Sequence, residues 1–104
     1  MSQRDVEEQN DRNFKDWKQT DITFLVLGLC GETGELANIT KKYIRWLLGW
    51  KGKYLTEEQF VKLLKGELAD VQIFLYLIAG KYGLNIEDLV REKQKINRER
   101  FGWK

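Results

Sequence analysis

The sequence predicts an all-α protein with four helices, and three observations support this class. Residues 24–39 and 60–79 carry apolar side chains at alternating steps of three and four, which is the spacing of one face of a helix. Residue types that start helices precede three of the predicted helices, at Asp21, Thr56 and Asn85. The 104 residues include no proline and show no strand-like alternation. At this length we expect one domain covering the whole chain, which a subunit interface would help to stabilise.

The first two helices are predicted from caps and apolar spacing. Residues 1–19 are mostly polar, with Val6, Phe14 and Trp17 as the main apolar residues, and predict a short helix that docks by its second half. Thr20 and Asp21 are good capping residues, so a second helix should run from about Asp21 to Leu48. Its inward stripe is predicted to comprise Leu25, Leu29, Glu32, Leu36, Ile39, Tyr43 and Trp46.

Small residues interrupt this second helix. Because glycine weakens a helix, Gly28, Gly31 and Gly34 indicate close backbone packing or room for a bound group, with tolerated glycines as the equal alternative. Cys30 is alone and is most simply a small buried residue, which excludes an intrachain disulfide.

A turn-rich connection, residues 49–54, leads to the third helix. It is either a lid carrying aromatic and basic groups or an exposed loop whose Trp50 packs down on the domain. Thr56 and Gln59 form a capping box, so the third helix should extend from Glu57 to about Tyr82 and stop at Gly83, with a break near Gly66 as an alternative. Its inward stripe is predicted to be Phe60, Leu63, Glu67, Asp70, Phe74 and Leu77.

Asn85 should cap a fourth helix that continues to Phe101. One face of this helix begins apolar and then becomes polar, with Val90, Lys93, Asn97 and Arg100 at steps of three and four. These polar groups could reach an anion, or they could form an ordinary solvated helix end.

Two acidic pairs lie on the apolar helices, and they are the main functional signal. Glu32 and Glu35 form one pair, and Glu67 and Asp70 form the other, each three residues apart and hence on one helix face. Burying an unpaired carboxylate costs on the order of several kcal/mol, so these acids must be protonated, paired with bases or bound to a cation. No Lys or Arg occurs between Asp21 and Thr40 or between Glu67 and Gly80. Four carboxylates without any histidine favour Mg²⁺, or Mn²⁺, over zinc or a ferritin-like di-iron centre.

Charge and hydropathy set the remaining expectations. The net charge is only +2, so composition argues against nucleic acid as a partner, although residues 41–66 are rich in lysine and arginine. The first residues lack the apolar core of a signal peptide. The apolar runs 24–30 and 73–79 are shorter than the roughly 20 residues that cross a bilayer. We therefore expect a soluble cytoplasmic protein with no membrane partner.

Three segments carry a resemblance to a known family. Residues 27–36 read Leu-Gly-Leu-Cys-Gly-Glu-Thr-Gly-Glu-Leu, residues 66–71 read Gly-Glu-Leu-Ala-Asp-Val, and residues 93–101 combine lysine, isoleucine, asparagine, arginine and phenylalanine. Together they resemble the all-α nucleoside triphosphate pyrophosphohydrolases of the MazG-like superfamily, from about Phe14 to Phe101. Asp16 and Trp17 resemble the dCTP pyrophosphatase branch.

The resemblance implies a four-helix bundle that forms a homodimer or homotetramer. It implies Mg²⁺-dependent hydrolysis of a nucleoside triphosphate, often a deoxynucleotide, to the monophosphate and pyrophosphate. Such an enzyme would serve in nucleotide-pool house-cleaning. It implies that Glu35 is catalytic, orienting the attacking water. The implied metal ligands are Glu32, Glu35, Glu67 and Asp70, the implied phosphate contacts are Lys93, Asn97 and Arg100, and the candidates for the base pocket, or alternatively for the core, are Trp17 and Phe74. Gly31 and Gly66 stand where many members carry further acids.

Two other classes of function remain open. The chain could be a helical module that holds single-stranded nucleic acid through Lys41, Lys42, Arg45, Trp46, Trp50, Lys51 and Tyr54. It could also bind a nucleotide without hydrolysing it, because the extra acids are missing. The residues do not choose between bases or sugars, between one and several metal ions, or between a dimer and a tetramer.

Overall fold

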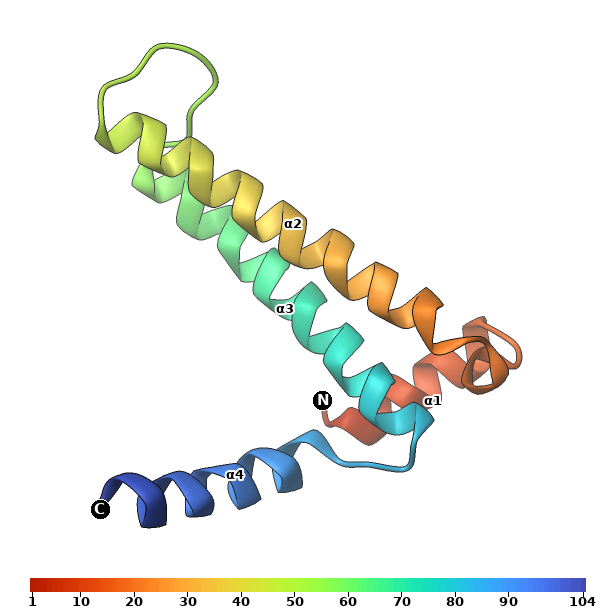
Figure 1. Cartoon of the computed structure of the whole chain (residues 1–104). Helices are drawn as coiled ribbons and strands as arrows, with labels where there is room; N and C mark the ends of the chain where they lie inside the picture. The colour runs from red at the N-terminus through yellow and green to blue at the C-terminus, as the bar shows by residue number, and fades with distance from the viewer. The chain divides into compact units, whose positions relative to one another are not determined.

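The computed structural model describes all 104 residues and contains four α-helices, one short 3-10 helix and no strand (Figure 1). The predicted all-α class and number of helices are therefore confirmed. The elements in chain order are α1 (Gln3–Asn13), η1 (Trp17–Gln19), α2 (Ile22–Leu47), α3 (Glu57–Lys81) and α4 (Ile86–Phe101). The chain divides into two compact units, whose placement relative to one another is not determined. We call them the hairpin unit (residues 21–74) and the terminal unit (residues 1–20 and 75–104).

The hairpin unit consists of α2 and most of α3, which lie side by side and antiparallel (Figure 1). Near the start of α2, Gly28 lies against the ring of Phe74. Near its end, the ring of Tyr43 lies 4.6 Å, centroid to centroid, from that of Phe60. Because contacts move backward along α3 as they move forward along α2, the two acidic pairs are brought to the same level of the hairpin.

The inward face of α2 follows the predicted stripe almost to its end. Leu25 and Ile39 are buried, the residues between them on the stripe and Tyr43 are half-buried, and Trp46 is exposed. On α3 the stripe is partly wrong, because Leu63 and Asp70 are exposed while Leu64 and Val71 are half-buried. The inward face of α3 passes through Phe60, Leu64, Glu67, Val71 and Phe74, at steps of four and three.

Local signals account for the helix ends. The amide of Thr23 donates to Asp21 Oδ1 at 2.9 Å, as expected of an N-cap. At α3 the predicted capping box is present: the amide of Thr56 donates to Gln59 Oε1 at 3.0 Å, and the amide of Gln59 donates to Thr56 Oγ1 at 3.3 Å. The helix continues through Gly66 without a break and ends just before Gly83, whose φ of 68° suits glycine.

In the terminal unit, the prediction that residues 1–19 dock by their second half is only partly right, because Trp17 of η1 is buried but α1 docks by its first half. Its buried residues are Gln3 and Val6, whereas Phe14 is 62% exposed. The Gln3 amide group donates to the carbonyl of Leu84 at 2.7 Å and accepts from the amide of Ile86 at 2.8 Å. A polar side chain therefore secures the start of α4, which apolar spacing alone would not reveal.

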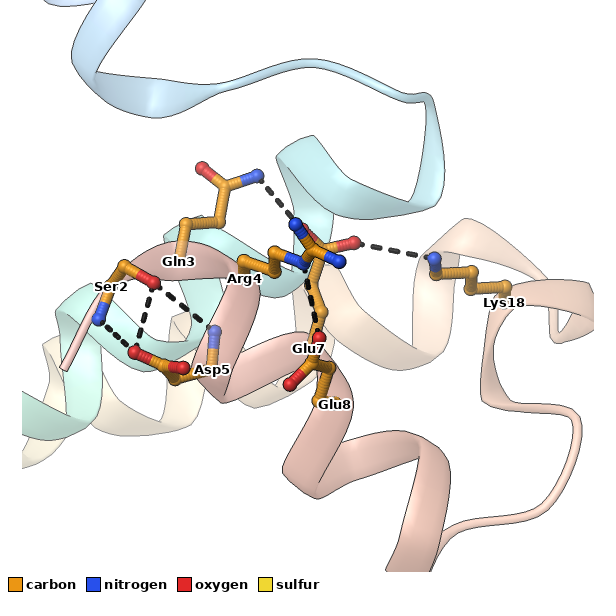
Figure 2. A network of polar contacts seen from close by, with 7 residues as sticks. All are labelled: Ser2, Gln3, Arg4, Asp5, Glu7, Glu8 and Lys18. Carbon is orange, nitrogen blue, oxygen red and sulfur yellow. Dashed lines mark hydrogen bonds and ion pairs between the residues drawn. The ribbon is translucent and has the colours of Figure 1, made fainter.

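Polar contacts also hold α1 in place (Figure 2). Ser2 and Asp5 form a capping box at its start, and Glu7 accepts from Gln3 and pairs with Lys18 at 3.3 Å. At the end of α3, the Lys81 ammonium donates to the carbonyls of Lys18 and Thr20. These contacts tie residues 1–20 to the last turn of α3 within the terminal unit.

Many large apolar side chains are exposed. They include Phe24, Leu27, Leu68 and Val90, each at least 53% exposed. The lone Cys30 is also exposed, so its predicted burial is wrong. By length and composition alone, α2 could cross a membrane, a test that core helices of soluble proteins also pass. The apolar run at residues 24–30 is too short to cross a membrane, but α2 as a whole is longer because it continues to Leu47.

Candidate metal centre

Three of the four predicted carboxylates come together in the hairpin unit. Glu32 and Glu35 project from α2 and Glu67 projects from α3, and one carboxylate oxygen of each lies within 4.8 Å of the others. We call these three residues the carboxylate cluster. Glu32 and Glu67 are half-buried, and Glu35 is exposed. The antiparallel pairing of the helices thus joins the acids of α2 to an acid of α3 that is at least 32 positions away in the chain.

Two oxygens of this cluster are buried without any hydrogen-bond partner. They are Oε2 of Glu32 and Oε2 of Glu67, and no other buried side-chain nitrogen or oxygen is unpaired. Buried polar atoms are nearly always satisfied, so two orphaned oxygens at one place need an explanation. A proton or a bound cation would supply one.

The charges of the cluster are not balanced by any base. The ion pairs of the protein are Arg4–Glu8, Lys18–Glu7 and Arg91–Asp88, and none involves the carboxylate cluster. Desolvation raises the pKa of Glu32, the charges of Asp70 and Glu35 raise this pKa further, and a proton shared with the Glu67 carboxyl group acts in the opposite direction. Desolvation also raises the pKa of Glu67, with the charge of Glu35 as the next cause. The cluster therefore holds its negative charge at a cost in free energy.

Asp70 stands apart from the other three acids. It is exposed and does not belong to the group of converging oxygens. Its charge still acts on the cluster, since it raises the pKa of both Glu32 and Glu67. Asp70 therefore adds negative charge near the cluster without joining it.

The donor set fits a hard divalent cation. Carboxylate oxygens suit Mg²⁺ and Mn²⁺, and the part-exposed position would leave coordination positions for water or phosphate oxygens. The two orphaned oxygens of Glu32 and Glu67 point to the same need for positive charge. Neither cysteine nor histidine joins the cluster, so a soft metal has no matching ligands.

The glycines near the cluster differ from one another. A methyl group on Gly28 would collide with the ring of Phe74, so close packing explains that glycine. Added methyl groups on Gly31, Gly34 and Gly66 would meet nothing within 4 Å. These three glycines are exposed, so they are tolerated glycines, whereas Gly28 marks close packing of the two helices.

The predicted base-pocket residues have structural roles in the protein. Trp17 is 5% exposed, and its indole nitrogen donates to Asp11 Oδ1 at 2.7 Å. Phe74 packs against Gly28 in the hairpin. These contacts are those of core residues, the alternative that the sequence left open for both.

The predicted phosphate contacts lie on α4, in the terminal unit. Lys93 and Arg100 are exposed, and Asn97 is half-buried. The Arg100 guanidinium lies 5.1 Å from the centroid of the Phe101 ring, and neither Lys93 nor Arg100 forms an ion pair. Both cations are thus free to bind an anion.

Sequence reasoning missed a groove on the hairpin unit. It runs along α2 beside Leu36, Thr40, Ile44 and Leu48, which follow one another at steps of four. This spacing is visible in the sequence and places the four residues on one side of the helix.

Comparison of the chain with family models, with curated proteins and with solved structures found no match.

Proposed function

We propose that the protein is a Mg²⁺-dependent nucleoside triphosphate pyrophosphohydrolase of the MazG-like kind. The observation that carries this proposal is the carboxylate cluster, with two buried oxygens that lack partners. The three motif segments that resemble this superfamily include all three acids of the cluster and Asp70. The proposal joins the geometry of the hairpin to that resemblance.

The proposed reaction is attack of water on the α-phosphorus of a nucleoside triphosphate. A new P–O bond forms, the bond from the α-phosphorus to the bridging oxygen breaks, and pyrophosphate leaves. Bound Mg²⁺ would neutralise phosphate charge and polarise the reacting groups. Glu32 and Glu67 would hold the cation with their converging oxygens. Asp70 would support them from the edge.

Glu35 is the proposed general base. It is the most accessible of the three clustered acids, so a water molecule can reach it. It would orient that water and accept its proton during attack. The resemblance to the superfamily, rather than the geometry of the hairpin unit, assigns phosphate binding to Lys93, Asn97 and Arg100 of the terminal unit, which would act through charge-assisted hydrogen bonds.

Self-association as a homodimer or homotetramer belongs to the same proposal. The exposed apolar side chains of α2, α3 and α4 support it, because a chain of this size seldom leaves so many uncovered. A second copy would cover part of this surface.

A screen of canonical and modified nucleoside triphosphates for pyrophosphate release tests the function. We expect Mg²⁺-dependent release by the wild-type protein and at least about a 100-fold lower rate for Glu35→Gln, since a general base typically contributes that much. Glu58→Gln is the matched control, because Glu58 is an exposed acid of α3 outside the cluster. Wild-type rates in Glu35→Gln would remove the proposed active site.

A nucleotide-binding protein without hydrolysis is the second candidate. It is favoured by Gly31 and Gly66, which have open space beside them and stand where many members of the resembled superfamily carry further acids. Calorimetric binding of a non-hydrolysable triphosphate analogue, compared with turnover of the same base, separates the two. Tight Mg²⁺-dependent binding without pyrophosphate release would establish this role.

A further inference from the structure

A groove of about 700 Å³ runs along α2 within the hairpin unit, and none of the three clustered acids lines it. Its floor is apolar and includes Leu36, Ile44 and Leu48, and Trp50 lines one end. The amide of Trp50 donates to the carbonyl of Arg45 at 3.0 Å, which holds the start of the loop beside the helix. The Trp50 side chain is nevertheless 63% exposed, so its predicted packing onto the domain is wrong.

The groove and its loop carry positive charge only. Lys41 and Arg45 line the groove, Lys51 and Lys53 follow in the loop, and no acid occurs in residues 41–54. None of these cations takes part in an ion pair. The same segment exposes aromatic surface on Trp46, Trp50 and Tyr54.

The apolar floor, the exposed aromatic side chains and the unpaired cations together favour one class of ligand over others. An apolar floor and an exposed indole suit unpaired bases, which stack on aromatic side chains, while unpaired cations suit the phosphates between those bases. A second copy of the chain fits less well, because a two-fold contact through this face would place cations against cations. An acidic peptide would satisfy the cations but would leave the aromatic faces without stacking partners.

We propose that this groove and the loop at residues 49–54 bind single-stranded nucleic acid. Bases stack on Trp50 and the apolar floor, and the backbone follows Lys41, Arg45, Lys51 and Lys53. Binding at this site requires neither the carboxylate cluster nor hydrolysis, so failure of the proposed enzyme function would not affect it.

Fluorescence anisotropy with a labelled oligothymidylate of about 15 nucleotides tests the proposal on the full chain. Contacts to four phosphates predict that binding weakens about 50-fold between roughly 0.05 and 0.2 M salt. Trp50→Ala should weaken binding on the order of tenfold, because stacking contributes that much per base. The double variant Lys41→Gln/Arg45→Gln should lose about half of the salt dependence.

Matched controls separate this site from general attraction to a basic protein. Lys95→Gln/Arg98→Gln removes the same charge from exposed positions of α4 and should leave affinity nearly unchanged. No binding at the lower salt, or equal loss in both double variants, would overturn the proposal. Displacement of the oligonucleotide by an equal concentration of a polyglutamate of matched charge would also overturn it and identify an acidic protein surface as the partner.

Discussion

Oε2 of Glu32 and Oε2 of Glu67 are the two side-chain oxygens that the structure buries without a partner. Both residues occupy inward positions that an apolar side chain would fill with a gain in stability. Their pKa values are raised by desolvation and by neighbouring acids. The residues therefore cost stability in the metal-free protein at neutral pH, which is understandable if a cation normally offsets that cost.

The raised pKa values of Glu32 and Glu67 predict that these two residues make the folded protein less stable as the pH rises, opposite to the effect of a carboxylate paired with a base. Because Glu32 and Glu67 bind protons more tightly in the folded state, their contribution is most favourable below the ordinary carboxyl pKa. It is lost as the pH rises through the raised pKa values. Relative to wild type, Glu67→Gln should therefore gain melting temperature as the pH rises from about 4 to 8 in a chelator. A constant difference across this range would contradict the raised pKa of Glu67, and Glu58→Gln provides the control.

Two glycines one turn apart should respond in opposite directions. Gly28→Ala should destabilise the protein by about 1–3 kcal/mol, because the ring of Phe74 must move to admit the methyl group. Gly31→Ala meets open space and should stabilise α2 by about 0.5–1 kcal/mol through helix propensity. Denaturant unfolding of both variants measures these changes. Equal effects of the two substitutions would contradict the packing of α2 on α3.

At the scale of the helix, the sequence predicts boundaries well because caps act locally. Asp21, Thr56 and Asn85 each accept a hydrogen bond from a helix amide at the predicted start. The antiparallel hairpin then brings three predicted acids together. The exposure of Asp70 was harder to predict. From Glu67 the inward face could continue by a step of three to Asp70 or by a step of four to Val71, and both steps are typical of one helix face.

Other errors come from contacts between segments distant in the chain. Gln3 bonds to backbone groups more than 80 residues away, and apolar periodicity contains no information on such a bond. The exposure of Cys30 has a different, local cause: it lies on α2 outside the stripe that faces α3. Caps and residue spacing therefore predicted the helices and the convergence of three acids, whereas they could not predict polar contacts between distant parts of the chain.

Removal of the α3 cap should have a measurable effect. Thr56→Ala should cost about 1 kcal/mol, because the amide of Gln59 loses its acceptor. Thr33→Ala is the control, since the Thr33 hydroxyl only bonds back to carbonyls of α2. Urea unfolding of both variants provides the comparison, and an equal or larger loss in Thr33→Ala would contradict the role of the cap.

At the scale of the whole molecule, the exposed apolar surface predicts association. Leu27 is 69% exposed and Leu68 is 53% exposed, on α2 and α3 respectively. We expect a dimer or tetramer in sedimentation velocity, with Leu27→Gln/Leu68→Gln shifting the population toward monomer. A monomer at every concentration for the wild-type protein would contradict the assembly.

Titration with Mn²⁺, followed by the loss of the free-ion signal in electron paramagnetic resonance, tests the central claim most directly. The claim is that Glu32, Glu35 and Glu67 converge to hold a divalent cation. We predict saturable binding that Mg²⁺ displaces, with a clear loss of affinity in Glu67→Gln and none in Glu58→Gln. Equal Mn²⁺ binding by the wild-type protein and Glu67→Gln, or no binding by either, would contradict the account.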